Sequence, residues 1–230
     1  MARARFSQLG GLPLLYDRNP ALNYGITGIP FSPWIDTTFA RQADAAFHQI
    51  VSSLSGVGLG EATAILSGGV GRSGNGPSLH HQNRAFDLDG LTFEEGQNWV
   101  ADTFPSRPLI YIGIEAILRQ HFGTVLSYQY NAAHRDHFHF DNGRAVGFRR
   151  DARSHTLFLQ NSFKYLFDEM LGIDGVYGPE TASVERRVRA ELGVGGLSNR
   201  ANWLDYLGTC VELALNREAE MKRLNTGAVA

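Results

Sequence analysis

The sequence predicts an α+β protein, with a small antiparallel sheet and flanking helices followed by a module of three helices. Two short segments, 85–89 and 137–141, alternate apolar and polar residues, as a strand with one buried face does. Two longer segments, 36–54 and 109–120, repeat apolar residues at helical spacing. Beyond residue 155 the patterns are helical, which places a helical unit after the sheet.

Length and composition restrict the class of protein. The 230 residues suffice for one domain of ordinary size and a small second one. A formal net charge of −2 gives no indication of nucleic-acid binding. The single cysteine, Cys210, permits no internal disulfide, and its apolar helical surroundings predict a buried thiol.

The N-terminal pattern does not predict a membrane segment. The apolar run 9–16 is short, contains Gly10, Gly11 and Pro13, and is followed directly by charged residues, unlike a signal peptide. No stretch approaches the length of a membrane span. We therefore expect synthesis in the cytoplasm without a signal peptide.

The elements of the first half follow in order. Segment 10–35, rich in Gly, Pro and aromatic residues, predicts an irregular wrapping segment. Asp36 or Thr37 can cap the first helix. A short strand is expected at 62–66. The Gly-rich loop 68–77 lacks the Gly-Lys-Ser/Thr ending of a phosphate-binding loop.

Two further helices and a strand are expected before the second alternating segment. Thr92 and Glu95 form a capping-box pattern, which predicts a helix over 92–104. The apolar spacing of 109–120 predicts the next helix, and segment 122–126 reads as a strand.

Side chains that can bind metal gather on the polar faces of the two alternating segments. Asp87 and Asp89 share one face of the first, and His137, His139 and Asp141 share one face of the second. A mixture of imidazole and carboxylate ligands is typical of zinc, and a catalytic zinc site has three protein ligands and an open position. The sequence therefore predicts a metal site between two strands.

Two motifs carry a family resemblance. Segment 78–87, Ser-Leu-His-His-Gln-Asn-Arg-Ala-Phe-Asp, resembles the Ser-x-His-x-x-Gly-x-Ala-x-Asp motif of the zinc D-Ala-D-Ala peptidases. Segment 137–139 resembles the His-x-His motif of the wider group that includes lysostaphin. The sequence departs from the first motif at Asn83, where Gly is usual, and adds an imidazole at His81.

A closer resemblance is to the family of extensin-like C-terminal domains. Its signature resembles segment 122–126 followed by segment 130–141, Tyr-Asn-Ala-Ala-His-Arg-Asp-His-Phe-His-Phe-Asp. The resemblance covers roughly residues 25–145, and the cysteines of that family are missing here.

These resemblances imply roles for the histidines. His80, Asp87 and His139 would hold a zinc ion. His137 would act as general base or stabilise the developing oxyanion, and His134 is the alternative for that role. Other histidine sites fit less well: there is no His-Glu-x-x-His, and no glutamate follows the His-x-His pair as a cupin-like dioxygenase would require.

Further residues are candidates for binding and orientation. Arg72 is either a solvated loop arginine or a residue whose guanidinium binds a substrate carboxylate or carbonyl. Related peptidases carry an arginine just before the first metal ligand, which favours the second role. Ser78 and Tyr130 are candidate substrate contacts, although Tyr130 could equally be a packing residue. Asp89 and Asp141 would orient imidazoles through the second ring nitrogen.

The C-terminal third changes character after a polar, basic connector at 142–155, which suggests a peptidase domain at 1–145 and a helical domain at 156–225. The expected helices span about 156–171, 180–193 and 199–222. The turn Ile-Asp-Gly-Val-Tyr-Gly-Pro-Glu-Thr between the first two resembles that of small three-helix peptidoglycan-binding domains. The alternative is a generic helical appendage.

The expected function is that of a zinc metallopeptidase acting on peptide stems or cross-links of bacterial peptidoglycan. The protein would resemble a phage endolysin released through a holin, or an injected effector with an immunity protein and secretion machinery as partners, acting at the wall or periplasm. Two alternatives remain: a D,D-carboxypeptidase, and a catalytically silent wall-binding protein stabilised by zinc.

Overall fold

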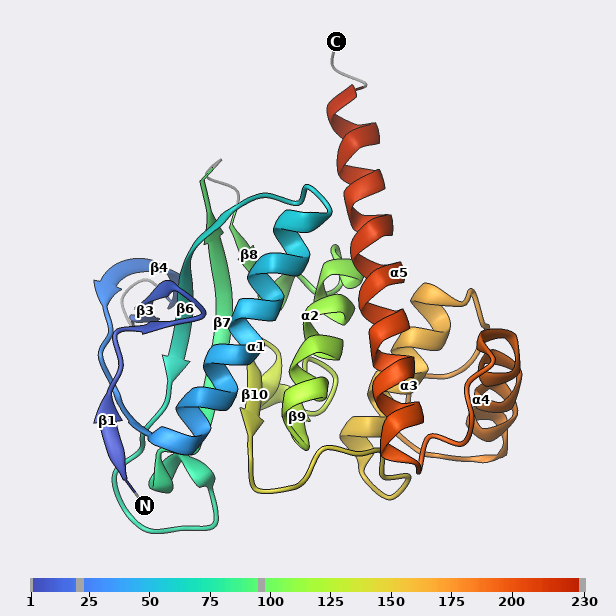
Figure 1. Ribbon diagram of the computed structural model, residues 1–230, viewed down its shortest axis with the longest axis horizontal. Helices are drawn as coiled ribbons and strands as arrows, with labels where there is room; N and C mark the ends of the chain where they lie inside the picture. Colours follow the sequence, from blue (N-terminus) through green and yellow to red (C-terminus); the bar gives the residue numbers. More distant parts are fainter. Residues whose placement is uncertain (1, 20–22, 95–97, 228–230) are drawn as a thin grey trace.

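The computed structural model describes residues 2–19, 23–94 and 98–227 of the chain. It has the predicted α+β composition (Figure 1). No helix of the described residues is long and apolar enough to cross a membrane.

The N-terminal segment is not irregular, contrary to the prediction for 10–35. Strands β1 (Arg3–Arg5) and β2 (Gln8–Leu9) precede it, and the segment itself forms β3 (Leu12–Asn19), β4 (Asn23–Pro30) and most of β5 (Trp34–Asp36). Gly10 and Gly11, at φ 58° and 78°, make the turn between β2 and β3. Strand β3 pairs with the neighbouring strands β2 and β4 and also with the remote strand at 62–69, and local composition does not reveal that remote pairing.

The main sheet is larger than predicted and mixed rather than purely antiparallel. Its strand order is β2-β3-β6-β7-β10-β9, with β4 paired to β3 and β8 to β7. The pair β3–β6 is parallel, and the other pairs are antiparallel. The remaining strands are β6 (Ala62–Gly69), β7 (Ala85–Phe93), β8 (Trp99–Val100), β9 (Thr124–Leu126) and β10 (Phe138–Asp141).

Helices α1 (Thr37–Gly56) and α2 (Pro108–His121) pack against the sheet. The predicted cap of α1 is confirmed, since the Asp36 carboxylate accepts hydrogen bonds from the backbone N–H groups of Thr38 and Phe39. Phe47 on α1 contacts Phe86 on β7 and Phe140 on β10, at ring-centroid distances of 5.4 and 6.2 Å. The apolar faces of both alternating strands therefore turn to the core, as their sequence pattern predicted, and α1 covers that core.

The helix predicted at 92–104 does not form in the residues that the structure describes. Strand β7 continues through Phe93, β8 follows, and only a 3₁₀ turn at Ala101–Thr103 is helical. Thr92 pairs with Ala64 in β6, so that strand pairing overrides the capping-box signal. Residues 95–97, including Glu95, lie outside the described residues.

Three C-terminal helices occur close to the predicted positions: α3 (Arg153–Leu166), α4 (Pro179–Leu192) and α5 (Arg200–Gly227). The turn before α4 is held by Gln160 on α3. Its amide nitrogen donates to Asp174 Oδ1 and Thr181 Oγ1, and its oxygen accepts from the backbone N–H of Gly175. The conspicuous Asp-Gly-x-x-Gly-Pro-x-Thr turn is thus fixed by one side chain of the preceding helix.

Helix α5 lies along α2 and so joins the helical part to the sheet part (Figure 1). A Cβ atom on Gly113 of α2 would lie 2.5 Å from Leu215 Cδ2, so the two helices approach closely. Arg107 at the start of α2 donates two hydrogen bonds to Glu218 of α5. Cys210 on α5 is fully buried, as predicted.

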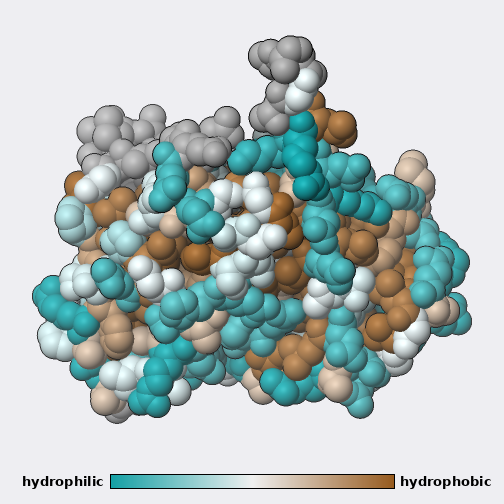
Figure 2. All heavy atoms as spheres, turned by 45° about the horizontal axis from the view of Figure 1, so that its top comes forward, coloured by the Kyte–Doolittle hydropathy of each residue, from teal (hydrophilic) through white to brown (hydrophobic). Residues whose placement is uncertain are grey.

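Apolar surface is visible beside α5 in Figure 2. A shallow groove between α1 and α5 is lined there by Val57, Val211 and Leu215. Further along, α5 projects beyond the body of the molecule (Figure 1), where Met221 and Leu224 are exposed.

Candidate metal centre

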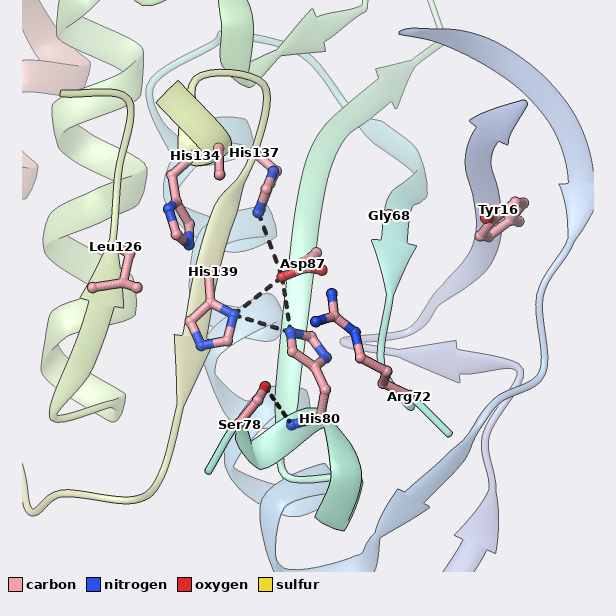
Figure 3. A pocket seen from close by; sticks show the side chains of 11 residues that line it. Tyr16, Gly68, Arg72, Ser78, His80, Asp87, Leu126, His134, His137 and His139 are labelled. Carbon is pink, nitrogen blue, oxygen red and sulfur yellow. Dashed lines mark hydrogen bonds and ion pairs between the residues drawn. The ribbon is translucent and has the colours of Figure 1, made fainter. Parts of the chain in front are cut away.

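An open cavity of about 590 Å³, called the metal cavity below, lies on the face of the sheet turned away from α1 (Figure 3). The strands β7 and β10 run through its floor. Their apolar residues pack into the core beneath, while Asp87 and His139 line the cavity. The alternation in the sequence therefore has the physical consequence expected of it: one face builds the core and the other builds the site.

Strand register brings two of the predicted ligands together. Strands β7 and β10 are antiparallel neighbours, and Asp87 stands directly opposite His139. Side chains of directly opposed residues lie on the same face and within contact distance. Asp87 and His139 are separated by 52 positions in sequence but become neighbours through this single register.

A short 3₁₀ helix, Leu79–Gln82, presents the third predicted ligand, His80. The hydroxyl of Ser78 caps this helix by accepting from the backbone N–H of His80 at 3.4 Å. The helix ends at Asn83, which has the left-handed φ of 57°. Asn tolerates that conformation better than most residues, which explains how it can replace the glycine of the related motif.

The three predicted ligands converge on one point. His80 Nε2 lies 3.0 Å from His139 Nδ1, and Asp87 Oδ1 lies 3.2 Å from each of these nitrogens (Figure 3). His80 is buried, and Asp87 and His139 line the cavity with only 16% and 12% of their side chains exposed. Such a set of two imidazoles and one carboxylate could hold a metal ion.

Each imidazole uses its second nitrogen to fix its orientation. His80 Nδ1 lies 2.8 Å from the carbonyl oxygen of Val70, and His139 Nε2 lies 3.2 Å from Asp141 Oδ2. Metal-binding histidines usually make this kind of contact, which sets the tautomer and the ring orientation. The contact predicted for Asp141 is therefore present.

The site has a strong preference for positive charge. Burial raises the pKa of Asp87, but hydrogen bonds to His139 and His80 outweigh it and hold the pKa well below its usual range. Burial lowers the pKa of His139, and its contacts with Asp141 and Asp87 overcome this and raise the pKa to about 9. Two carboxylates thus favour a cation at this point, whether a proton or a metal ion.

His137 lies beside the three candidate metal ligands. Its Nε2 lies 3.6 Å from Asp87 Oδ1, and its Nδ1 lies 2.7 Å from Asp136 Oδ1. An ionised carboxylate can only accept, so Nδ1 donates to Asp136, and in the neutral ring Nε2 is the nitrogen that can accept a proton. Asp136 was not among the predicted site residues, although its position directly before His137 could have suggested this contact.

His134 also lines the cavity, next to His137 and His139, and these three residues form its histidine wall. Its ring centroid lies 5.2 Å from that of His137 and 5.9 Å from that of His139. Burial, with the neighbouring His137 and His139, lowers the pKa of His134 to about 4. His81, in contrast, is not in the cavity lining; its Nδ1 lies 3.2 Å from the Arg72 carbonyl oxygen.

The other predicted site residues take different positions. Arg72 and Ser78 line the cavity, and the exposed Arg72 extends towards it (Figure 3). Tyr130 lines a neighbouring cavity instead. Asp89 is fully buried and is not part of the lining of the metal cavity.

Tyr16 on β3 forms the far wall of the cavity, which the sequence did not indicate (Figure 3). It packs against Phe31 with ring centroids 5.5 Å apart. The parallel pairing of β3 with β6 places Tyr16 opposite Ser67, beside the site. No local signal in the sequence could have revealed that pairing.

Comparison with known proteins identifies the family. Residues 27–150 match the family described as extensin-like protein C-terminus, and this segment contains His80, Asp87 and His139. No curated protein and no solved structure matches the chain. The matched segment covers more than half of the sequence, and the protein belongs to the extensin-like protein C-terminus family.

Proposed function

We propose that this protein is a zinc-dependent peptidase that cleaves peptide stems or cross-links of bacterial peptidoglycan. The observation that carries the proposal is the triangle formed by His80 Nε2, Asp87 Oδ1 and His139 Nδ1, with sides of 3.0 to 3.2 Å. Zinc–ligand distances of about 2.0–2.1 Å in a tetrahedron separate the ligand atoms by roughly 3.3 Å. The donor set therefore has the size and chemistry that zinc requires.

Three protein ligands and an open cavity favour catalysis over a purely structural metal site. Structural zinc is usually enclosed by four protein ligands, whereas catalytic zinc keeps a position for water or substrate. Zinc bound here would polarise a scissile carbonyl and acidify a water molecule. The neighbouring cavity, at about 590 Å³, can admit part of a peptide chain.

The protein side chains supply proton transfer and charge stabilisation in this proposal. His137 lines the cavity, and its Nδ1 donates to Asp136 Oδ1 at 2.7 Å, which leaves Nε2 of the neutral ring as the proton-accepting nitrogen. It is therefore placed to accept a proton from the attacking water and return it to the leaving amine. The Arg72 guanidinium has no ion-pair partner among the described residues and can bind a substrate carbonyl or carboxylate.

The peptidoglycan substrate is supported by the two motif resemblances rather than by contacts. The metal segment resembles the D-Ala-D-Ala peptidase motif, and the turn held by Gln160 resembles that of peptidoglycan-binding helical domains. A helical part that binds the wall would raise the local enzyme concentration at an insoluble substrate.

Digestion of purified peptidoglycan tests the proposal. Mass spectra of soluble muropeptides should show new amine and carboxylate ends at a peptide bond after incubation with the full-length protein. A chelator should abolish the products, and added zinc should restore them. Loss of only a terminal D-alanine would identify a D,D-carboxypeptidase. Unchanged spectra with fully zinc-loaded protein would contradict the peptidase and favour a silent wall-binding protein.

A further inference from the structure

A second cavity, of about 300 Å³, lies beside the metal cavity. Part of its lining comes from the loop between β9 and β10, through Tyr128, Tyr130 and Arg135. The rest comes from the C-terminal helical part, through Arg153 at the start of α3 and Ile173 in the following turn. The cavity therefore lies between the part of the chain that carries the candidate metal centre and the helical part, and both parts line it.

The two cavities share one wall. The 3₁₀ turn Ala132–His134 lines the second cavity through Ala132 and the metal cavity through Ala133 and His134. The ring centroid of Tyr130 lies 5.6 Å from that of His134, which in turn lies 5.9 Å from that of the candidate ligand His139. A molecule that crosses this turn can therefore reach both cavities.

Two cationic side chains line the second cavity. Arg135 and Arg153 line it, and no Asp or Glu is among its lining residues. Both arginines are exposed, and Arg135 makes no hydrogen bond or ion pair with the described residues. Guanidinium groups recognise carboxylates by two parallel hydrogen bonds, so two of them in one cavity favour an anionic ligand.

Arg153 is held in a defined position. One Nη1 hydrogen is donated to the Tyr130 carbonyl oxygen, and the guanidinium carbon lies 5.7 Å from the centroid of the Tyr130 ring. The stem of Arg153 passes over Gly175, where a Cβ atom would lie 2.7 Å from Arg153 Cγ. This preorganisation reduces the conformational entropy that binding of a ligand would cost.

We propose that the second cavity is a carboxylate-binding subsite for an extended peptide whose scissile bond lies at the metal centre. This inference rests on the proposed peptidase function and specifies its substrate. The contacts from Arg153 through Tyr130 and His134 to His139 span a distance that an extended peptide of about four or five residues can bridge. The substrate would thus carry a free carboxylate a few residues from the cleaved bond.

The helical part would consequently take part in substrate recognition at the metal centre. Arg153 belongs to α3, and its position depends on the turn that contains Gly175. That role is separate from any tethering to the insoluble wall, because it also acts on short soluble peptides.

Steady-state kinetics with synthetic stem peptides tests the subsite. Two peptides are compared, one with its free carboxylates and one with those carboxylates amidated. For Arg153→Gln and Arg135→Gln we expect KM for the free peptide to rise roughly tenfold to hundredfold, the scale of a lost charge-assisted hydrogen bond, with little change in kcat. The amidated peptide should bind all variants equally weakly.

Arg150→Gln is the matched control. Arg150 also lies over a tyrosine ring, at 5.0 Å from the centroid of Tyr177, but it does not line the second cavity. It should leave both constants unchanged. An equal increase of KM in all three variants would contradict the subsite, as would equal KM values for the two peptides with the wild-type protein.

A direct binding measurement separates this inference from the proposed function. Calorimetric titration of the metal-depleted full-length protein with the same peptides requires no turnover. Binding of the free peptide that Arg153→Gln weakens, without hydrolysis by the zinc-loaded protein, would support the subsite and contradict the peptidase. Hydrolysis without any effect of Arg135→Gln or Arg153→Gln would support the peptidase and overturn the subsite.

Discussion

His80 Nε2 and His139 Nδ1 lie 3.0 Å apart, yet neither nitrogen has a hydrogen for the other when both rings are neutral. His80 donates from Nδ1 to the Val70 carbonyl, and His139 donates from Nε2 to Asp141. The two bare nitrogens and the Asp87 carboxylate are all acceptors. Three acceptors within 3.2 Å of one another repel unless a cation lies among them.

We therefore expect one metal ion per chain, bound by His80, Asp87 and His139. Alanine substitution at any of the three should leave substoichiometric metal, because two protein ligands hold zinc much more weakly than three. Elemental analysis of protein dialysed against buffered zinc measures this.

The matched control is His81→Ala, which removes the adjacent imidazole that is not in the cavity lining. It should retain one equivalent of metal. Full occupancy in all three ligand variants would refute the assignment, and loss of metal in His81→Ala would show that the segment had been disturbed as a whole.

A second prediction separates the proton acceptor from the ligands. His137→Ala should keep its metal but lose turnover by roughly a hundredfold or more, the usual scale for a general acid–base group. Metal content and kcat are measured on the same preparation. His134→Ala provides the comparison within the same histidine wall. If turnover survives in His137→Ala and falls in His134→Ala, the two roles are exchanged; loss of metal would make His137 a ligand.

Site residues could be predicted where the pattern of their own strand specifies them, but not where they depend on pairing with a remote strand. The alternation of Phe138, His139, Phe140 and Asp141 contains both the core face and the site face, so β10 and its polar residues could be predicted. The capping-box pattern at 92–95 misled, because the pairing of β7 with β6 is a remote interaction that local propensity does not contain. Tyr16 was missed for the same reason, since it reaches the cavity through β3 and β6.

A buried histidine away from the metal centre predicts a pH dependence of stability. His155 Nδ1 accepts from the backbone N–H of Arg149 at 3.1 Å, and Nε2 lies 3.3 Å from the Gly123 carbonyl oxygen. Burial, with the positive charge of Arg119, lowers its pKa to about 3. The unfolded chain would titrate this group near its ordinary value of 6.5.

Between pH 6.5 and pH 3 the unfolded state thus binds a proton that the folded state does not, so the folded state loses stability as pH falls. The loss amounts to at most about 1.4 kcal/mol per pH unit, or roughly 2–3 kcal/mol at pH 4.5. Urea unfolding at pH 7.5 and 4.5, in the presence of a chelator, measures it. His155→Gln should reduce the difference between the two pH values, whereas the exposed control His48→Gln should not. An unchanged difference in His155→Gln would contradict this account.

The division into segments 1–145 and 156–225 can be tested through the contact between α2 and α5. Leu215 is 1% exposed and packs against Gly113. Buried residues of α2, such as Ile112 and Ala116, share a core cluster with residues of all three C-terminal helices. Leu215→Ala should therefore lower the free energy of unfolding by about 2–5 kcal/mol, as large-to-small substitutions in a core do.

The shape of the unfolding transition decides between two views of the helices. If α2 and α5 form one cooperative unit, circular dichroism and intrinsic fluorescence should report a single urea transition that Leu215→Ala shifts as a whole. The exposed Val176→Ala, in the turn before α4, should change the free energy of unfolding by less than about 0.5 kcal/mol. Two separate transitions, of which Leu215→Ala shifts only one, would instead support the helices as an independently folding module.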